Sequence, residues 1–587
     1  MEAPLARTPL LSHLSRALRT IRKARSAGVP VLEYAEAEAE RRRQGVSRRG
    51  FLAGSAGAAA ALTLPLGLGL STSGCGGDGG TGKDTDVAIV GGGIAGLHCA
   101  HRLRKIGIRP RLYDAQTRLG GRMLSDRVTF ASPDAQLCEL GGELIDTGHM
   151  TMRDLATELG LALDDFDTDD GTLDKVVAYI GGRKLTSAEI LTGFGPIAMK
   201  IDQALATLTD QEDLFVYYDK PNGGQALDAM SIKGWLDSIG ASGPVRTLLE
   251  VAYNIEYGLE VEQQNCLNML FLISTDTAKL DLFGDSDERY HTKLGNDSYI
   301  SKLSAGLDPA AVFMDHKLTR IAPRSGGGYT LTFMQGATPV EANAAHVVLA
   351  LPFSILREVE ILVDLPAAKK KAIAEVGYGT NSKLMAGFSS RPWRTTHRSN
   401  GETFTDLPFQ ATWETSRLQA GTSGIITNFT GGLRGVSIGD GTPDAQLATF
   451  LGQFDMLFPG AMAAGNGKVA RFHWPTHPFV KGSYTAYKVG QYTAFAGAEI
   501  ERVGNLHFCG EHTSLDAQGY MEGGALTGAM AADEIADDAG LASASQSSRA
   551  AWSPSAAVDP VAAEARIMSR ARLARARRRW LRGALVR

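Results

Sequence analysis

The sequence predicts an α/β protein in which a domain built on a βαβ unit is combined with a second, α+β domain. Three observations predict this fold. An apolar strand runs into a glycine turn and a helix at 87–100, VAIVGGGIAGLHCA, and a second strand follows at 109–113. Apolar side chains recur at helical spacing over 151–163 and 230–255. Residues 312–351 alternate in polarity as strands do.

Length and composition indicate several domains and no nucleic-acid partner. The chain has 587 residues, 44% of them hydrophobic, and a formal net charge of −4. At about 100–200 residues per domain, two or more domains are expected. The five cysteines (Cys75, Cys99, Cys138, Cys266 and Cys509) are odd in number and widely spaced, which predicts neither a disulfide framework nor a metal site. Those at 99, 138 and 509 lie in apolar runs and are expected to be buried.

The glycine turn after the first strand has the pattern that binds a dinucleotide. Gly91 permits the tight turn, Gly93 lets the backbone approach a pyrophosphate, and Gly96 lets the helix pack against the strand. The helix N-terminus at Ile94 and Ala95 offers free N–H groups to the phosphates. The turn therefore predicts a dinucleotide site.

A second motif follows at the end of the second strand. Asp114 lies about 20 positions beyond the turn, where it can accept hydrogen bonds from a ribose hydroxyl. The run YDAQTRLGGR at 113–122 resembles the acidic residue, spacer and R-x-G-G-R sequence of the flavin-containing amine oxidases. In that family the counterpart of Arg122 helps to bind the FAD diphosphate. The resemblance adds to the expected cofactor-binding residues Ala115, Arg118 and Gly121.

Two further segments resemble the same family. The run ELGGELID at 139–146 is similar to the segment whose backbone follows the flavin ring, and LHFCGEHT with GYMEGGALTG, at 506–528, is similar to the family's ending. In the family the counterpart of Glu511 bonds FAD, and a helix starting near Met521 points its N-terminus at the flavin. The resemblance implies FAD as cofactor, with further contacts from Leu140, Gly141, Gly142, Glu143, Leu318, Gly510, Glu511, Tyr520 and Met521.

The resemblance also covers the residues of amine oxidation. The run YGTNSKLMA at 378–386 is similar to the segment that bears a lysine near flavin N5, which makes Lys383 the catalytic candidate. The run WPTHPFVKGSY at 474–484 brings Tyr484 to the position where, with Tyr520, it would form an aromatic cage that steers the amine. The implied reaction is hydride transfer from the amine α-carbon to flavin N5, giving an imine, with O2 reoxidising the flavin to release H2O2. Ser483 replaces the cysteine that links FAD covalently in monoamine oxidases, so we expect non-covalent FAD.

Carboxylates beside the glycine pair favour an amine without an α-carboxylate. L-amino-acid oxidases carry an arginine there, whereas this chain has Glu143 and Asp146. A carboxylate would meet like charge, but a primary amine or polyamine would not. We expect Glu143, Tyr484 and Tyr520 to contact this substrate. The alternatives are an L-amino-acid oxidase on the same scaffold, with an arginine such as Arg289 arriving from elsewhere, a flavin desaturase or porphyrinogen-type oxidase, and a non-catalytic FAD-fold binding protein.

The motifs divide the chain into two discontinuous domains. The FAD-binding domain is expected over 85–150, 291–365 and 476–540, and the substrate domain over 151–290, mainly helical, and 366–475. The active site is expected at their interface, a common location for ligand pockets. A homodimer is compatible with this organisation.

The two ends differ from the middle of the chain. An N-terminal extension covers 1–46. Residues 47–75 then begin with SRRGFL and continue without charge, a pattern that resembles a twin-arginine export signal. This resemblance predicts that the twin-arginine machinery exports the folded protein to the periplasm, the cell envelope or the medium. The segment before Cys75 matches a lipobox in part, so a lipid anchor and simple cleavage both stay open. Residues 76–84 are expected to be a linker, and 541–587 a disordered, arginine-rich tail.

Overall fold

A computed structural model describes residues 86–541, except 212, 278–281 and 285. The predicted extension, export signal, Cys75, linker and arginine-rich tail lie outside the described residues. None of the helices in the described part combines the length and apolar character needed to cross a membrane.

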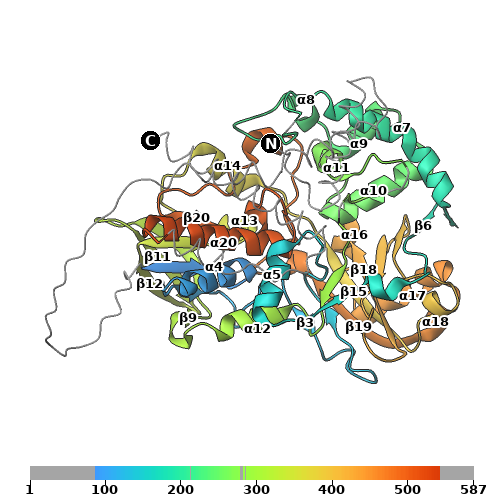
Figure 1. The fold of residues 1–587 in the computed structure, drawn as a ribbon, viewed down its shortest axis with the longest axis horizontal. Helices are drawn as coiled ribbons and strands as arrows, with labels where there is room; N and C mark the ends of the chain where they lie inside the picture. Colours follow the sequence, from blue (N-terminus) through green and yellow to red (C-terminus); the bar gives the residue numbers. More distant parts are fainter. Residues whose placement is uncertain (1–85, 212, 278–281, 285, 542–587) are drawn as a thin grey trace, which may run out of the picture. The chain divides into compact units, whose positions relative to one another are not determined.

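The predicted βαβ unit is the centre of a five-stranded parallel sheet. The strand order is β20 (Leu506–Phe508), β13 (His346–Leu349), β1 (Val87–Val90), β2 (Arg111–Tyr113) and β9 (Val312–Phe313). All four residues of β1 are buried. Helices α4 (Ile94–Lys105) and α20 (Met521–Asp538) pack side by side against this sheet (Figure 1), although more than 400 residues separate their starts. This sheet therefore draws together the three parts of the expected FAD-binding domain.

A smaller four-stranded sheet packs beside the first. Its order is β12 (Thr338–Ala344), β11 (Tyr329–Gln335), β10 (Lys317–Pro323) and β14 (Glu360–Ile361), with β10 to β12 antiparallel. The rings of Tyr113 and Phe333 stack with their centroids 4.5 Å apart and join the two sheets. The expectation of strands over 312–351 is met by β9 to β13.

The expected substrate domain contains a seven-stranded mixed sheet. Its order is β19 (Gly465–His473), β15 (Ser382–Phe388), β18 (Gly424–Thr430), β17 (Ala411–Glu414), β16 (Thr403–Thr405), β6 (Val177–Ile180) and β7 (Arg183–Lys184). Along β15 the side chains alternate, so that Leu384, Ala386 and Phe388 join the core under α17 (Pro443–Leu457). Lys383 and Met385 therefore face the opposite side of the sheet.

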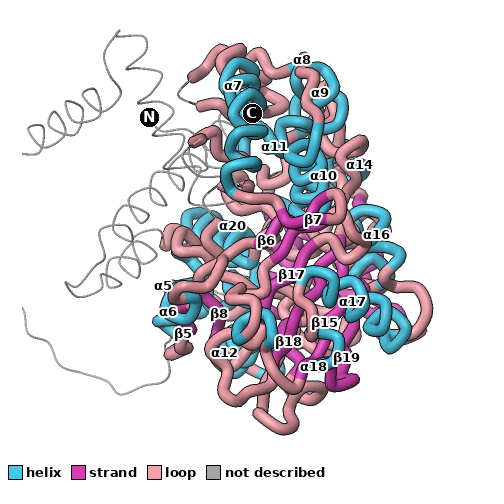
Figure 2. Tube along the Cα trace, turned by 90° about the vertical axis from the view of Figure 1, so that its right-hand side faces the viewer, coloured by secondary structure: helices cyan, strands magenta, loops and turns pink. Residues whose placement is uncertain are grey.

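Helices α7 to α11 gather at one end of this sheet (Figure 2). They are α7 (Ser187–Leu205), α8 (Gln225–Asp228), α9 (Ile232–Ser238), α10 (Gly243–Tyr257) and α11 (Cys266–Leu272). The helical pattern at 230–255 forms two helices, because Gly240 turns the chain between them with φ +68°. The pattern at 151–163 forms α5 (Met150–Leu159), which ends at Gly160 before the strand β5 (Leu163–Asp165).

Short elements complete the described fold. The strands are β3 (Ser125–Asp126), β4 (Cys138–Glu139) and β8 (Tyr290–Thr292), and the helices are α6 (Asp167–Asp170), α12 (Asp297–Ala305), α13 (Phe353–Leu356), α14 (Ala367–Glu375), α15 (Pro392–Thr395), α16 (Gly432–Ser437), α18 (Ala461–Ala464) and α19 (Gln491–Phe495), with 3-10 turns at Pro309–Ala311, Trp474–Thr476 and Glu511–Thr513. The four described cysteines are buried and unpaired, as expected for core residues.

Candidate active site

One large cavity extends from the parallel sheet to the seven-stranded sheet. It is lined by the loops that follow β1, β2, β13 and β20, and on the other side by residues of β15 to β18. Ligands of parallel α/β sheets bind at the carboxyl ends of the strands. The cavity therefore lies where the fold places a dinucleotide and also where the two predicted domains meet.

The glycine turn forms one end of this cavity. Gly91 has φ +108°, and a Cβ there would lie 2.5 Å from the carbonyl oxygen of Ala350. Gly93 has an ordinary φ of −76°, and a Cβ there would meet no atom within 4 Å because the residue borders the cavity. Gly96 lies outside the cavity, where a Cβ would come 2.0 Å from the Gly91 oxygen. The turn thus leaves an open, side-chain-free surface beside the N-terminus of α4, at Ile94 and Ala95.

Asp114 closes the turn from the end of β2. Its carboxylate accepts the N–H of Gly92 at 2.7 Å and that of Gln116 at 2.8 Å. Burial raises its pKa above the ordinary value. Asp114 and Ala115 line the cavity, where the carboxylate retains lone pairs for a hydroxyl donor. Arg118 does not line the cavity; it donates to the carbonyl oxygen of Gly121 at 2.7 Å and so braces the second glycine turn.

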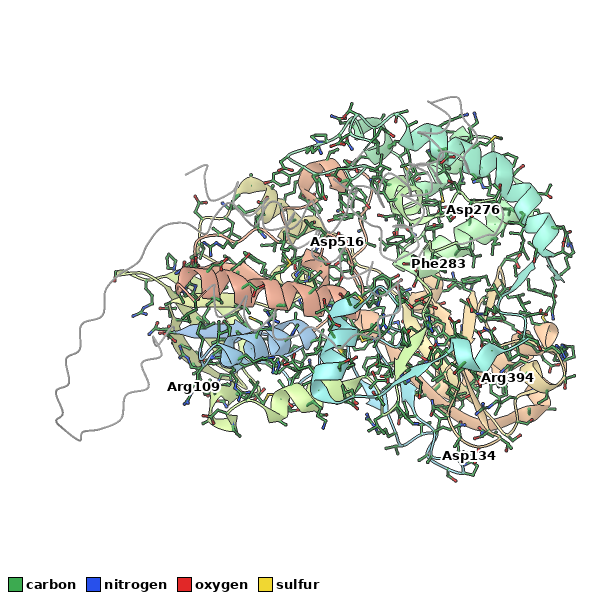
Figure 3. The ribbon with its side chains drawn as sticks, viewed as in Figure 1. Arg109, Asp134, Asp276, Phe283, Arg394 and Asp516 are labelled. Carbon is green, nitrogen blue, oxygen red and sulfur yellow. The ribbon has the colours of Figure 1, made fainter. Side chains whose placement is uncertain are left out.

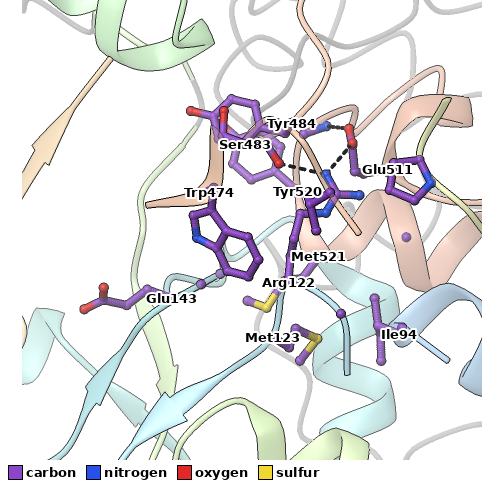
Figure 4. A pocket seen from close by; sticks show the side chains of 18 of the residues that line it. Ile94, Arg122, Met123, Glu143, Trp474, Ser483, Tyr484, Glu511, Tyr520 and Met521 are labelled. Carbon is purple, nitrogen blue, oxygen red and sulfur yellow. Dashed lines mark hydrogen bonds and ion pairs between the residues drawn. The ribbon is translucent and has the colours of Figure 1, made fainter. Parts of the chain in front are cut away.

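Arg122 and Glu511 form an ion pair at the middle of the cavity. The Nη1 atom of Arg122 lies 2.7 Å from Glu511 Oε1 and donates to the Ser483 carbonyl oxygen at 2.9 Å (Figure 4). Glu511 also accepts the N–H of Gly519 at 2.8 Å. Burial alone would raise the pKa of Glu511, but the charge and hydrogen bond of Arg122, together with His512 and the Gly519 N–H, lower the pKa below its ordinary value. The pair ties together the first and last segments of the expected FAD-binding domain.

The flavin-facing segment is packed too closely for side chains at its glycines. A Cβ at Gly141 would lie 1.8 Å from the Arg122 carbonyl oxygen, and one at Gly142 would lie 2.9 Å from Met521 Sδ. Leu140 does not line the cavity, but its carbonyl oxygen accepts the indole N–H of Trp474 at 3.0 Å. Tyr520, Met521 and Gly524 bring the N-terminus of α20 to the cavity wall. Its free N–H groups and positive dipole end therefore face the cavity.

Lys383 faces the cavity from β15 and is 5% exposed. Its Nζ atom donates to Glu143 Oε2 at 2.7 Å and to the Glu139 carbonyl oxygen at 3.3 Å. The other oxygen of Glu143 accepts the hydroxyl of Thr415 at 2.9 Å. Burial alone would raise the pKa of Glu143, but the charge and hydrogen bond of Lys383, together with His291 and Trp413, lower it below the ordinary value. The structure therefore engages the Glu143 carboxylate within the protein, whereas the sequence placed it at the substrate.

Tyr484 and Tyr520 both line the cavity (Figure 4) and both reach the end of α10. The Tyr484 hydroxyl donates to the Glu256 carbonyl oxygen at 2.7 Å, and the Tyr520 hydroxyl lies 3.1 Å from Glu256 Oε1. The Tyr520 ring also packs on His149, with centroids 5.1 Å apart. One residue of α10 therefore fixes both rings at the cavity wall.

Two carboxylates that the sequence did not indicate also line the cavity, Glu288 and Glu402. They lie near Phe283 and Phe404, whose ring centroids are 5.6 Å apart. Phe283 stands where the helices meet the seven-stranded sheet (Figure 3). Burial raises the pKa of both carboxyls to about 7. No local pattern marks them, since Glu288 precedes β8 and Glu402 precedes β16, and only the tertiary fold brings them together.

Several predicted residues lie away from this cavity. Leu318 is in β10, buried in the core and opposite Phe333. Arg289 forms an ion pair with Asp165, with 2.7 Å between Nη2 and Oδ2, and does not line the cavity. It is therefore not in place to bind a substrate carboxylate. Asp146 does line the cavity, but Ser286 donates to it at 3.0 Å and burial raises its pKa well above the ordinary value.

One histidine cluster lies outside the cavity. His346, His507 and Asp538 are near enough to share a metal ion, although the sequence gave no sign of such a group. The imidazoles already contact each other, with 3.2 Å between Nδ1 and Nε2, and His507 bonds Glu534. Asp538 forms an ion pair with Arg502. These partners account for the cluster as a hydrogen-bonded network.

The cavity residues fit FAD. The open surface at Gly93 can accept a diphosphate, Asp114 has lone pairs for a ribose, and Arg122 supplies a positive charge. His512 lines the cavity, is 1% exposed, and has no hydrogen-bond partner for either ring nitrogen among the described residues. A buried imidazole without partners is costly, and a bound ligand with hydroxyl and phosphate groups would satisfy it.

The fold and this cavity define a dinucleotide-dependent oxidoreductase, and comparison with known proteins gives its family. Residues 94–536 match the family of flavin containing amine oxidoreductases, so the chain belongs to that family and is an FAD-dependent amine oxidase. AofH of Mycobacterium tuberculosis, a protein named as a flavin-containing monoamine oxidase, is 26% identical over 459 residues, which cover 77% of this chain and 96% of the relative.

Solved structures share the fold. Cyclohexylamine oxidase from Brevibacterium oxydans superposes with a TM-score of 0.66 at 22% identity, over 78% of this chain and 99% of that one. Putrescine oxidase bound to putrescine gives a TM-score of 0.64 at 18% identity, over 77% of this chain and 99% of that one. The expected α/β fold with an FAD-binding βαβ unit is confirmed.

Proposed function

We propose that the protein oxidises primary amines or polyamines that lack an α-carboxylate, and that O2 accepts the electrons. The charges of the cavity carry this proposal. Among the described residues that line the cavity, the only arginine is Arg122 and the only lysine is Lys383. Arg122 is paired with the carboxylate of Glu511, and Lys383 with that of Glu143. A substrate carboxylate would therefore find no uncommitted cation, whereas a substrate ammonium would find acidic side chains.

Some cavity residues would orient the amine, and others would stabilise charge during the reaction. When bound, FAD would supply the hydride acceptor, and O2 would take up the electrons with release of H2O2. Tyr484 and Tyr520, fixed by Glu256, present rings between which an amine can be held. Lys383, fixed by Glu143, places N–H donors at the cavity wall, and the N-terminus of α20 favours negative charge that develops nearby.

We also propose that FAD is bound without a covalent link. The Ser483 hydroxyl donates to Asn381 Oδ1 at 2.6 Å and cannot form a thioether. Acid precipitation should therefore release all of the flavin into the supernatant. Flavin that stays in the pellet would contradict this part of the proposal.

The function is tested by oxygen uptake and peroxide release with the full chain, comparing primary amines, polyamines and L-amino acids. We expect amines to give O2 uptake and H2O2 in equal amounts, and L-amino acids to give neither. Turnover of L-amino acids in preference to amines would favour an L-amino-acid oxidase instead.

Export is a further part of the proposal, supported by the SRRGFL run at 47–52. Replacing both Arg48 and Arg49 with lysine should retain the flavoprotein inside the cells that produce it. Equal export of the wild type and the double variant would contradict it.

A further inference from the structure

We infer that the substrate is a diamine or polyamine whose second ammonium group binds between Glu288 and Glu402. This inference rests on the proposed function, because it assigns two further residues of the same cavity. The amine that reacts would lie between Tyr484 and Tyr520, and the remote ammonium would lie at the acid pair.

The backbones of the acid pair are anchored, and both residues line the cavity. The Glu288 N–H donates to Asp146 Oδ1 at 2.9 Å, and the Glu402 N–H donates to Asn400 Oδ1 at 3.0 Å. Glu288 is more than a third exposed, and Glu402 is partly exposed, although both are surrounded by protein. In the described part of the chain neither carboxylate forms an ion pair with lysine or arginine. Two fixed acids therefore border the same space without a counter-ion.

The charged side chains around the acid pair do not neutralise its negative charge. The cations that act on it are Arg417 and Lys383. Lys383 is paired with Glu143, and Arg417 lies 3.9 Å from Asp170 Oδ1 and 4.1 Å from the Phe166 ring centroid. The neighbouring acids that act on the pair are Glu143, Asp170 and Asp287. A carboxylate surrounded by protein is costly without a cation, so a substrate ammonium is the group that this arrangement lacks.

The aromatic and apolar part of the cavity wall suits a methylene chain. Phe283, Phe404 and Phe429 line it together with Trp413 and Ile255. An aliphatic spacer buries apolar surface against such rings, while its two ends need polar or charged partners. The cavity thus offers an aromatic cage, an apolar wall and an acid pair, the groups that the two ends and the spacer of an α,ω-diamine need.

Proton release follows from this assignment. Burial raises the pKa of Glu288 and Glu402 to about 7, and the charge of Glu288 contributes to the shift of Glu402. Near pH 7 each carboxyl is therefore partly protonated, and a bound ammonium would favour the ionised form and expel protons. Diamine binding should strengthen as the pH rises through 7, because the two carboxyls ionise. A monoamine of equal length should not show this pH-dependent gain in binding.

The test compares butane-1,4-diamine with butylamine in the full-length holoenzyme. Glu288→Gln and Glu402→Gln should each lower kcat/KM for the diamine by about tenfold or more, the size expected for losing a charge-assisted contact. The butylamine value should change less than about threefold. Glu375→Gln, at an exposed position of α14, serves as the control, and Glu288→Asp, which keeps the charge, should retain the diamine preference.

The outcomes separate the inference from the proposed function. Equal losses for diamine and monoamine in variants that keep their bound flavin would overturn the acid pair as an ammonium site. Wild-type enzyme that prefers butylamine at every pH would overturn it too. Failure of every amine to be oxidised by the wild type would instead overturn the proposed function itself.

Discussion

Lys383 Nζ lies 2.7 Å from Glu143 Oε2, and this buried pair joins β15 of the seven-stranded sheet to the segment that follows β4. The lysine comes from the expected substrate domain and the glutamate from the expected FAD-binding domain. Because the hydroxyl of Thr415 holds the second oxygen of Glu143, the carboxylate is fixed from two sides. The pair therefore sets the position of the one lysine among the described residues that line the cavity.

Lys383→Met should lower peroxide formation per bound flavin by about 10²-fold, the usual effect of removing one electrostatic group at a reacting centre. Methionine has similar volume but no N–H donors. Lys371→Met, at an exposed position of α14, is the matched control. An unchanged rate in Lys383→Met would remove the lysine from the mechanism.

The ion pair also predicts a coupling in stability. Glu143→Ala alone leaves a buried ammonium unpaired and should cost about 3–5 kcal/mol in the free energy of unfolding. The double variant Glu143→Ala, Lys383→Met should lose less than the sum of the single variants, by about 1–3 kcal/mol. Thermal unfolding of the four proteins measures this difference, and strict additivity would show that the two residues do not interact.

The same pair predicts how stability depends on pH. The folded pKa of Glu143 is lowered, so its contribution is present above the ordinary carboxyl pKa and is lost as the pH falls through the folded value. The melting temperature of the wild type should therefore fall more steeply on acidification than that of Glu143→Gln. Parallel curves would contradict the lowered pKa.

Gly93→Ala should fold but retain FAD poorly. The residue has φ −76°, which alanine adopts freely, and a Cβ would meet no protein atom within 4 Å. The new methyl group would instead occupy the space that a diphosphate needs. The flavin-to-protein absorbance ratio measures retention, with Gly452→Ala in α17, where a Cβ also meets no atom within 4 Å, as control. Full FAD loading of Gly93→Ala would place the diphosphate elsewhere.

Variants of the aromatic cage separate the rings from the hydroxyls. Tyr484→Leu and Tyr520→Leu remove a ring and should cost about 1–2 kcal/mol in kcat/KM, or a factor of about 5 to 30. The phenylalanine variants keep the ring and lose the hydroxyl contacts with α10, so they should be affected less. Equal effects of leucine and phenylalanine at either position would assign the role to the hydroxyl.

The parts of the fold that could be predicted from the sequence are those that local pattern determines. The glycine turn at Gly91, Gly93 and Gly96 and the helix that starts at Met521 require particular residues at fixed spacing, and the structure forms both as expected. The inward orientation of Lys383 follows the alternation of an apolar strand.

The parts that could not be predicted depend on contacts between distant segments. Glu143 was expected at the substrate, but its partner, Lys383, lies 240 residues away. Glu288 and Glu402 belong to segments without a local pattern, and only the packing of β8 and β16 around one cavity reveals them.

The account is tested most directly by anaerobic reduction of the enzyme-bound flavin. The full-length holoenzyme is mixed with amines, polyamines and L-amino acids in turn, and the visible absorbance of the flavin is followed. We predict bleaching by amines and polyamines, and none by L-amino acids. Bleaching by L-amino acids alone would contradict the account, because it would require a free cation for the substrate carboxylate at a cavity where Arg122 and Lys383 are both paired.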